Sequence, residues 1–343
     1  MTVIHVTVSL LPVVLFLAGL MLIDSYKLVR GRAVFLSLLV GGVAAGLSWV
    51  VNTWLVRNYG ISDDQLQRYV APFVEELFKA SYITYILARN RVGFTVDAAI
   101  TGFAVGAGFA VIENIYYLSD EGGASLRIWV IRGIGTAIMH GGTMAVFAIL
   151  AKSFRDRMND ARIAPLVIAF TAAFLLHSVY NHFPLGPDYG AAVQVVVFPL
   201  IIASMFHESE KRTRSWLGSG FDTDQELLKS IISGDISETR IGEYLRALKE
   251  RFEGPIVVDM LCLIRIRVEL SLRAKGVLMM RNAGFKVQPD PMTRHKFAEL
   301  KYLEESIGRT GLLAIEPVHK WTRRDLWQLN LIDVSGSDAS SSG

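Results

Sequence analysis

Long apolar runs alternate with short polar segments over residues 1–206 of the chain. A helix needs about 20 mostly apolar residues to cross the hydrocarbon core of a bilayer. The pattern therefore predicts seven membrane-spanning helices, at about residues 3–23, 33–55, 70–88, 95–118, 128–151, 163–183 and 190–206. No basic segment precedes the first run and no small-residue cleavage site stands out, so we interpret it as a retained span and not as a signal peptide.

The pattern changes after residue 206, where charged residues of both signs become frequent. Apolar residues between 237 and 252 recur at helical spacing. The apolar run 255–280 is interrupted by charged residues, so we do not count it as an eighth span. We predict a compact helical cytoplasmic domain over 207–334 and a disordered Ser/Gly-rich tail over 335–343. The expected fold class is all-α, a polytopic membrane helical bundle followed by this helical domain.

Composition supports a membrane protein and limits its partners. Hydrophobic residues make up 52% of the chain, and the mean hydropathy is +0.37. The formal net charge of +3 is nearly neutral, which argues against a nucleic-acid partner. The single cysteine, Cys262, excludes an internal disulfide and a metal site built from a cysteine pair.

Basic residues are divided unequally between the two sets of loops that seven spans create. One set contains Arg57, Arg68 and Arg127. The other set contains twelve basic residues: Lys27, Arg30, Arg32, Arg89, Arg91, Lys152, Arg155, Arg157, Arg162, Lys211, Arg212 and Arg214. Loops rich in Lys and Arg remain in the cytoplasm. We therefore predict an outside N-terminus, a cytoplasmic C-terminus and insertion into a bacterial-type plasma membrane.

The predicted span 70–88 carries three charged residues, Glu75, Glu76 and Lys79. A charge at the centre of a membrane helix costs at least about 2.5–3.5 kcal/mol, so the three need a compensating use. Glu75 and Lys79 are four residues apart on a helix, and we predict an ion pair between them. The structural alternative is that the charged residues form a polar clasp between spans.

Other ionisable residues occur at a matching depth in separate spans. Depth in the bilayer can be counted from the outer end of each span at about 1.5 Å per residue. The depths of Glu113, His140 and His177 agree with those of the two carboxylates of span 70–88 to within about two helical turns. Arg132 lies near a span end, from where its side chain can reach the interface. We predict that the deeper groups meet at one site in the outer half of the bilayer.

Carboxylates and imidazoles in one site favour hydrolysis by an activated water molecule, because the carboxylate can accept a proton and the imidazole can donate to an oxyanion. Two imidazoles and a carboxylate also form a zinc set with an open position, which makes Glu113, His140 and His177 candidate metal ligands. The local spacing is not HExxH, so zinc and a metal-free site both stay open. For His140 alone, a hydrogen bond between helices is the competing interpretation.

Four ordered motifs on successive spans resemble one known family. Residues 75–79 (EELFK) match EExxK, and residues 109–114 (FAVIEN) match FxxxEN. His140 is a lone histidine in the next span, and residues 177–181 (HSVYN) match HxxxN. In this order the motifs, within residues 35–206, resemble the PrsW family of intramembrane proteases, which is similar to the wider CAAX-protease group.

The resemblance implies hydrolysis of peptide bonds within the lipid bilayer, with a membrane-anchored protein such as an anti-sigma factor as the substrate. It also implies roles for the site residues. Glu75 and Glu76 would hold or activate the water, Glu113, His140 and His177 would complete the centre, and Asn181 would help to form the oxyanion site. The family has been classed both as metallo and as glutamic-type, so the expected cofactor is zinc or none. A homo-oligomer is compatible with the sequence.

Two other functions are compatible with buried charges in a membrane. Carboxylates and histidines also form ion relays, so a proton- or cation-coupled transporter is one alternative, although no convincing pair of inverted repeats is visible. A non-catalytic scaffold that presents the cytoplasmic domain to a partner is the other. Replacing Glu75, Glu76 or Glu113 by Gln separates them, because only a protease then loses cleavage while the protein stays inserted.

Overall fold

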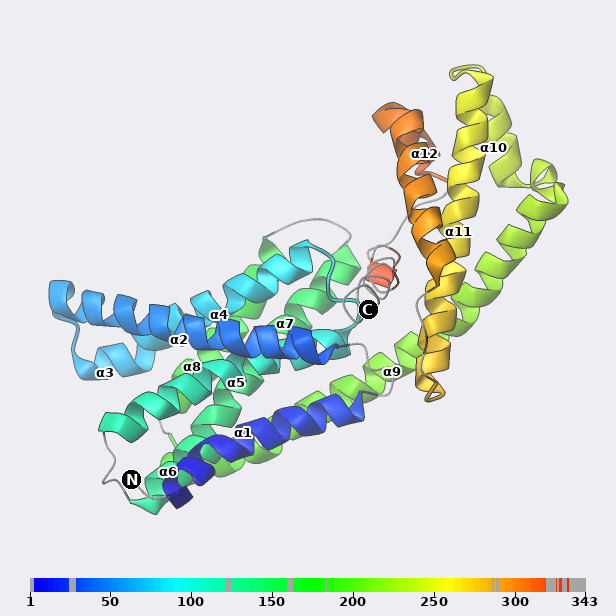
Figure 1. Ribbon diagram of the computed structural model, residues 1–343. Coiled ribbons are helices and arrows are strands. Elements are labelled where there is room, and N and C mark those ends of the chain that lie inside the picture. The colour runs from blue at the N-terminus through cyan, green and yellow to red at the C-terminus, as the bar shows by residue number, and fades with distance from the viewer. Residues whose placement is uncertain are drawn as a thin grey trace. The chain divides into compact units, whose positions relative to one another are not determined.

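A computed structural model describes most of the chain. The described residues are 3–24, 29–120, 125–158, 163–182, 184–285, 287, 290–318, 325, 327, 328 and 332. Within these ranges every regular element is a helix (Figure 1), which confirms the all-α fold class. The predicted disordered tail, 335–343, lies outside the described residues. The chain divides into two compact units, Met1–Glu210 and Lys211–Gly343, and each is described by itself.

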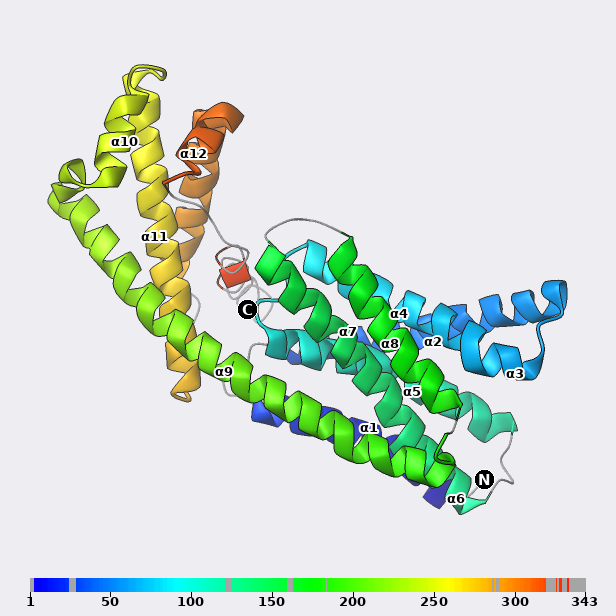
Figure 2. The same cartoon turned by 180° about the vertical axis from the view of Figure 1, so that it is seen from behind.

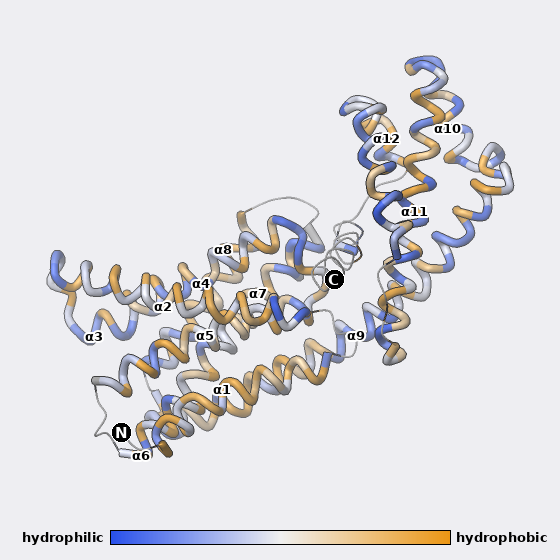
Figure 3. The backbone as a smooth tube through the Cα atoms, in the orientation of Figure 1, coloured by the Kyte–Doolittle hydropathy of each residue, from blue (hydrophilic) through white to orange (hydrophobic). Residues whose placement is uncertain are grey.

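The first unit contains the helices that the apolar runs predict. They are α1 (Val3–Ile23), α2 (Gly31–Tyr59), α3 (Asp63–Gln65), the π-helical segment η1 (Leu66–Val70), α4 (Ala71–Ala88), α5 (Thr95–Asp120), α6 (Leu126–Val130), the π-helical segment η2 (Ile131–Thr136), α7 (Ala137–Met158), α8 (Ala164–Asn181) and the start of α9 (Pro187–Ser233). In Figure 3, α1 is largely orange, the colour of apolar residues, and the other long helices of this unit carry orange stretches, whereas the region of α3 is mostly blue.

Six helices in the described part of the chain are long and apolar enough to cross a membrane. They correspond to six of the seven predicted spans, which makes the chain a multi-pass membrane protein. The seventh predicted span is α4, and it differs because three of its 18 residues, Glu75, Glu76 and Lys79, are charged. α4 is nevertheless packed among α2, α5, α7 and α8. The charged residues of α4 are therefore buried against the neighbouring apolar helices.

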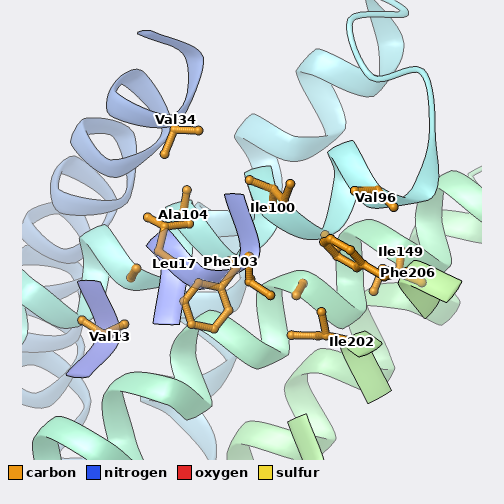
Figure 4. Close-up of a cluster of buried hydrophobic side chains, with 14 of the residues drawn as sticks. Val13, Leu17, Val34, Val96, Ile100, Phe103, Ala104, Ile149, Ile202 and Phe206 are labelled. Carbon is orange, nitrogen blue, oxygen red and sulfur yellow. The ribbon is translucent and has the colours of Figure 1, made fainter. Parts of the chain in front are cut away.

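Close packing of α5 positions the polar residues. α5 packs against α1, α2 and α7, and its Ile100, Phe103 and Ala104 lie in a buried cluster with side chains of α1 and α9 (Figure 4). α1 and the first part of α9 run side by side in both views (Figures 1 and 2). A Cβ atom added at Gly106 of α5 would lie 2.0 Å from the carbonyl oxygen of His140 on α7. Only glycine allows the two backbones to approach so closely, as membrane helices often do.

α9 is longer than predicted. We expected a span at 190–206 followed by a separate domain, but the helix continues as one element of 47 residues to Ser233. It passes through Gly218 and Gly220 without a break and ends before Gly234, whose φ of 85° lies in the left-handed region that ends a helix.

The second unit is helical, as predicted. After the last part of α9 come the 3₁₀ segment η3 (Asp235–Glu238), α10 (Arg240–Leu248), α11 (Gly254–Asn282) and α12 (Pro291–Ile315). α11 packs against both α10 and α12. It buries Met260, Leu263 and Leu270. α11 contains the run 255–280 and is not one of the six span candidates, in agreement with its charged residues.

Candidate active site

The charged motif lies on the face of α4 that is turned into the first unit. α4 continues directly from the π-helical segment η1, and Pro72 in its first turn supplies no N–H to the preceding turn. Glu75, Glu76 and Lys79 are all buried. Because burying a charge requires a partner, their contacts define what this face of the helix does.

Lys79 pairs with Glu76, and not with Glu75 as we predicted. Lys79 Nζ lies 2.5 Å from Glu76 Oε1, and both side chains are 0% exposed. Residues three and four apart are both neighbours on a helix, so spacing alone did not decide between the two carboxylates. Glu76 lies deeper, and Thr143 of α7 also donates to its Oε1, at 3.4 Å. The ion pair therefore forms where water does not reach either charge.

The Glu76–Lys79 pair fixes the proton on His177. His177 Nδ1 is 2.8 Å from Glu76 Oε1. An ionised carboxylate can only accept hydrogen bonds, so Nδ1 is the nitrogen that carries hydrogen. The neutral ring then has a free lone pair on Nε2. This nitrogen points toward Glu75, whose Oε2 is 3.9 Å away.

The same pair gives His140 the opposite tautomer. Lys79 Nζ lies 3.1 Å from His140 Nδ1. Because an ammonium group only donates, Nδ1 accepts and the hydrogen of the neutral ring is on Nε2. His140 Nε2 then donates to Glu113 Oε2, at 3.1 Å. One buried ion pair thus orients two imidazoles, whose ring centroids are 4.9 Å apart.

Glu75 completes a cluster of possible metal ligands. Its Oε2 is buried and has no hydrogen-bond partner among the residues that the structure describes. One ligand atom from each of Glu75, His140 and His177 can be chosen so that all three lie within 4.8 Å of one another. Our predicted metal set contained Glu113 in place of Glu75. In the structure Glu113 contacts His140 and Arg132 instead, at 3.1 and 3.5 Å.

The donor set fits a divalent cation of the zinc type. Two imidazoles and one carboxylate are a ligand set that catalytic zinc sites use. The unpartnered Glu75 Oε2 and the lone pair of His177 Nε2 are available without rearrangement. His140 Nε2 becomes available when its hydrogen passes to Glu113 and Nδ1 takes a proton from Lys79 Nζ in its place. Glu76 then acts as the carboxylate that orients a ligating histidine through its other nitrogen.

The site opens into a cavity. A cavity of about 1140 Å³ lies between α2, α4, α5, α7 and α8. Its wall includes Glu75, Glu113, His140 and His177. Glu76 does not line it and is fully buried. The predicted residues therefore form two layers: one faces the cavity, and the other is buried behind it and orients the side chains of the first.

Asn181 lines the cavity and also bonds to the backbone of η1. Its Nδ2 donates to the backbone carbonyl of Gln67 at 2.9 Å. Nδ2 carries two hydrogens, so this bond uses one of them and leaves the other for the predicted oxyanion role. The contact joins the end of α8 to η1, together with the bond from Ser178 Oγ to the carbonyl of Arg68 at 2.6 Å.

Arg132 belongs to the site and was missed. We placed it near a span end, within reach of the interface, but its side chain points to Glu113 and is only 17% exposed. It lies in the π-helical segment η2, where the α-helical register is interrupted. Such segments are rare and occur often at functional sites, but no residue type in the sequence announces one. The guanidinium lies 3.6 Å from the ring centroid of Tyr117.

One comparison with known proteins gives a match. The model of a family described as PrsW family intramembrane metalloprotease matches residues 29–205, more than half of the chain. The match includes α2, α4, α5, α7 and α8, which form the cavity. No curated protein and no solved structure matches the chain.

Proposed function

Because the chain belongs to the PrsW family of intramembrane metalloproteases, we propose that it cleaves membrane-anchored proteins at the cavity that bears Glu75, His140 and His177. The chain is a peptidase of the membrane, with a membrane protein as its substrate. The proposal assigns this activity to particular residues. The observation that carries it is the convergence of three ligand atoms, from α4, α7 and α8, in the wall of one cavity.

We propose that Glu75, His140 and His177 hold a divalent metal, with zinc as the favoured ion. A metal ion in such a set acts as a Lewis acid toward a peptide carbonyl and makes water more acidic. If His140 Nε2 were a ligand, it would release its hydrogen to Glu113, on the way to solvent, and Nδ1 would take a proton from Lys79 Nζ so that the ring stays neutral. Glu76 and Lys79 keep the two rings in place because they bond to the nitrogens that face away from the cluster.

Glu113 is the carboxylate that we assign to proton transfer. It lines the cavity and lies outside the three-ligand cluster, so it remains available as a base. When water attacks the peptide carbonyl, the new C–O bond forms and a water proton passes to Glu113. The C–N bond then breaks, and the proton goes to the leaving amine nitrogen. This is the general acid–base exchange that a positioned carboxylate performs.

The location of the substrate follows from the loop charges. Basic residues concentrate in the loops that lie on the same side of the membrane as the C-terminus. We therefore propose a cytoplasmic C-terminus and a cavity in the outer half of a bacterial-type plasma membrane. A substrate of the anti-sigma-factor type, cleaved first on the outer side, is compatible with that position. We propose no transporter or scaffold function, because the family match indicates a peptidase.

The test uses the full chain in liposomes with single-span peptides. We expect the wild type to cleave them, a chelator to stop cleavage, and added zinc to restore it. Glu75→Gln and His177→Ala are expected to remain inserted and inactive. Glu305→Gln, a change at a side chain that is 69% exposed, is the control and is expected to match the wild type. Failure of the wild type to cleave any single-span substrate contradicts the proposal, and activity that persists in chelator contradicts its metal part alone.

A further inference from the structure

The guanidinium of Arg132 has hydrogen-bond donors that no described residue accepts. Its Nε and Nη2 are buried and have no hydrogen-bond partner in the part of the chain that the structure describes. Nη2 is 3.5 Å from Glu113 Oε2, which is an ion-pair distance without hydrogen-bond geometry. Leaving a buried donor unpaired costs free energy, so this arrangement needs an explanation.

The position of Arg132 limits what can accept those hydrogen bonds. The face of the guanidinium is covered by the ring of Tyr117, with 3.6 Å from Cζ to the ring centroid. The group can therefore bond only at its edges. Nε and Nη2 share one edge, which matches the two oxygens of a carboxylate. The nearest carboxylate is Glu113, and its Oε2 is at present bonded to His140 Nε2.

We propose that Arg132 is a positioning residue that receives Glu113 when His140 binds the metal. The inference rests on the proposed function, because it assumes that His140 Nε2 becomes a ligand. An imidazole nitrogen that ligates a metal carries no hydrogen, so Nε2 then does not donate to Glu113, and the hydrogen of the neutral ring is on Nδ1, supplied by Lys79 Nζ. Glu113 then turns to the Nε–Nη2 edge of Arg132, which satisfies both buried donors and holds the carboxylate beside the cavity.

The change of partner of Glu113, from His140 to Arg132, affects the affinity for the metal. Without Arg132, Glu113 has His140 as its main partner and competes with the metal for it. Loss of such an outer partner typically weakens metal binding by about 10- to 100-fold. We therefore expect Arg132→Gln to weaken zinc binding by that range. Arg132→Lys keeps the charge but loses the two-pronged edge, so its zinc affinity is expected to lie between those of Arg132→Gln and the wild type.

A double-mutant cycle on the purified full chain tests this inference, with zinc titrated against a competing chelator. In a Glu113→Gln background the competitor for His140 is altered, and the added change Arg132→Gln is expected to leave zinc affinity within about twofold. If Arg132 only supports the fold, its removal weakens binding equally in both backgrounds, which overturns the inference. Equal affinity of Arg132→Gln and the wild type overturns it as well.

The matched control is Arg89→Gln. Arg89 also lies over a tyrosine ring, at 5.7 Å from Tyr85, but it follows the last residue of α4 and is exposed. Its zinc affinity is expected to equal that of the wild type. A wild-type protein that does not bind zinc at all contradicts the metal part of the proposed function, and this result is distinct from a normal wild type with no effect of Arg132→Gln.

Discussion

Both units of the protein contain a lysine that is buried beside a carboxylate, and the pairs Lys79–Glu76 and Lys275–Asp224 have different surroundings. Lys79 lies 2.5 Å from Glu76 in the first unit, and Lys275 lies 2.7 Å from Asp224 in the second. Both lysine side chains are almost inaccessible to solvent, at 0% and 3% exposure. The two pairs are similar in distance and in the burial of the lysine, but the Asp224 side chain is 20% exposed whereas that of Glu76 is 0% exposed.

The difference is in the groups that the pairs contact next. Lys275 also donates to the backbone carbonyl of Gly220, and Ser271 donates to Asp224. Neither of these partners changes its charge, and such a network stabilises a fold. The Lys79–Glu76 pair instead bonds to two imidazoles in a cavity wall. A buried ion pair is therefore weak evidence for function unless it orients groups that can exchange protons or bind a ligand.

The strongest test of this comparison replaces one carboxylate by its amide in each unit. Glu113→Gln removes the proposed proton acceptor, and we expect the cleavage rate to fall by about 10²- to 10⁴-fold. Asp224→Asn is the matched change in the second unit and is expected to leave the rate per folded molecule unchanged. Initial rates on a single-span peptide, normalised to folded protein, give the measurement. The comparison is wrong if Asp224→Asn loses as much activity as Glu113→Gln.

Replacing each lysine by methionine tests the two pairs directly. Lys79→Met leaves a fully buried carboxylate without its cation, and we expect it to lower local stability by about 3–5 kcal/mol. Lys275→Met leaves the partly exposed Asp224, so its effect on stability is expected to be smaller. Hydrogen exchange of amides in α4 and in α11 reports the two units separately.

Removing the carboxylate as well sharpens the contrast. We expect Lys79→Met combined with Glu76→Gln, and Lys275→Met combined with Asp224→Asn, to regain most of the lost stability. Cleavage per folded molecule is expected to stay at the wild-type level in the second double variant and to be lost in the first, because only the first lacks the groups that orient His140 and His177. Wild-type cleavage in both would show that the Lys79–Glu76 pair is structural too.

Much of the fold was predictable because hydrophobicity determines it. Six apolar runs became helices long enough to cross a membrane, and the four motifs identified α4, α5, α7 and α8 as the helices that carry the site. The partner of Lys79 was not predictable, because Glu75 and Glu76 are both within reach on a helix and their tertiary surroundings differ. Arg132 was missed because η2 changes the helical register near it, and the sequence has no marker for that change.

Zinc binding is expected to have an effect of intermediate size on local stability. A ligand that binds only the folded state, at 100 times its dissociation constant, stabilises it by about 2.7 kcal/mol. We expect zinc to slow hydrogen exchange in α4, α7 and α8 by an amount of this order and to leave α11 and α12 unchanged. The protection is expected to disappear in His177→Ala. Equal protection of both units would mean that zinc acts outside the cluster of Glu75, His140 and His177.

The smallest effects come from the two hydroxyl groups that bond to the carboxylates of the pairs. Ser271 Oγ lies 2.5 Å from Asp224 Oδ2, whereas Thr143 Oγ1 lies 3.4 Å from Glu76 Oε1. A hydrogen bond to a charged group contributes about 1.5 kcal/mol or more, and a long bond contributes less, so Ser271→Ala is expected to destabilise its unit more than Thr143→Val. The order for activity is expected to be the reverse. Glu76 Oε1 also accepts from His177, so a small displacement of this oxygen moves a proposed ligand, and we expect Thr143→Val alone to reduce kcat several-fold. Stability and kcat measured on both variants decide the point, because a purely structural role for Glu76 requires the two quantities to change in the same order.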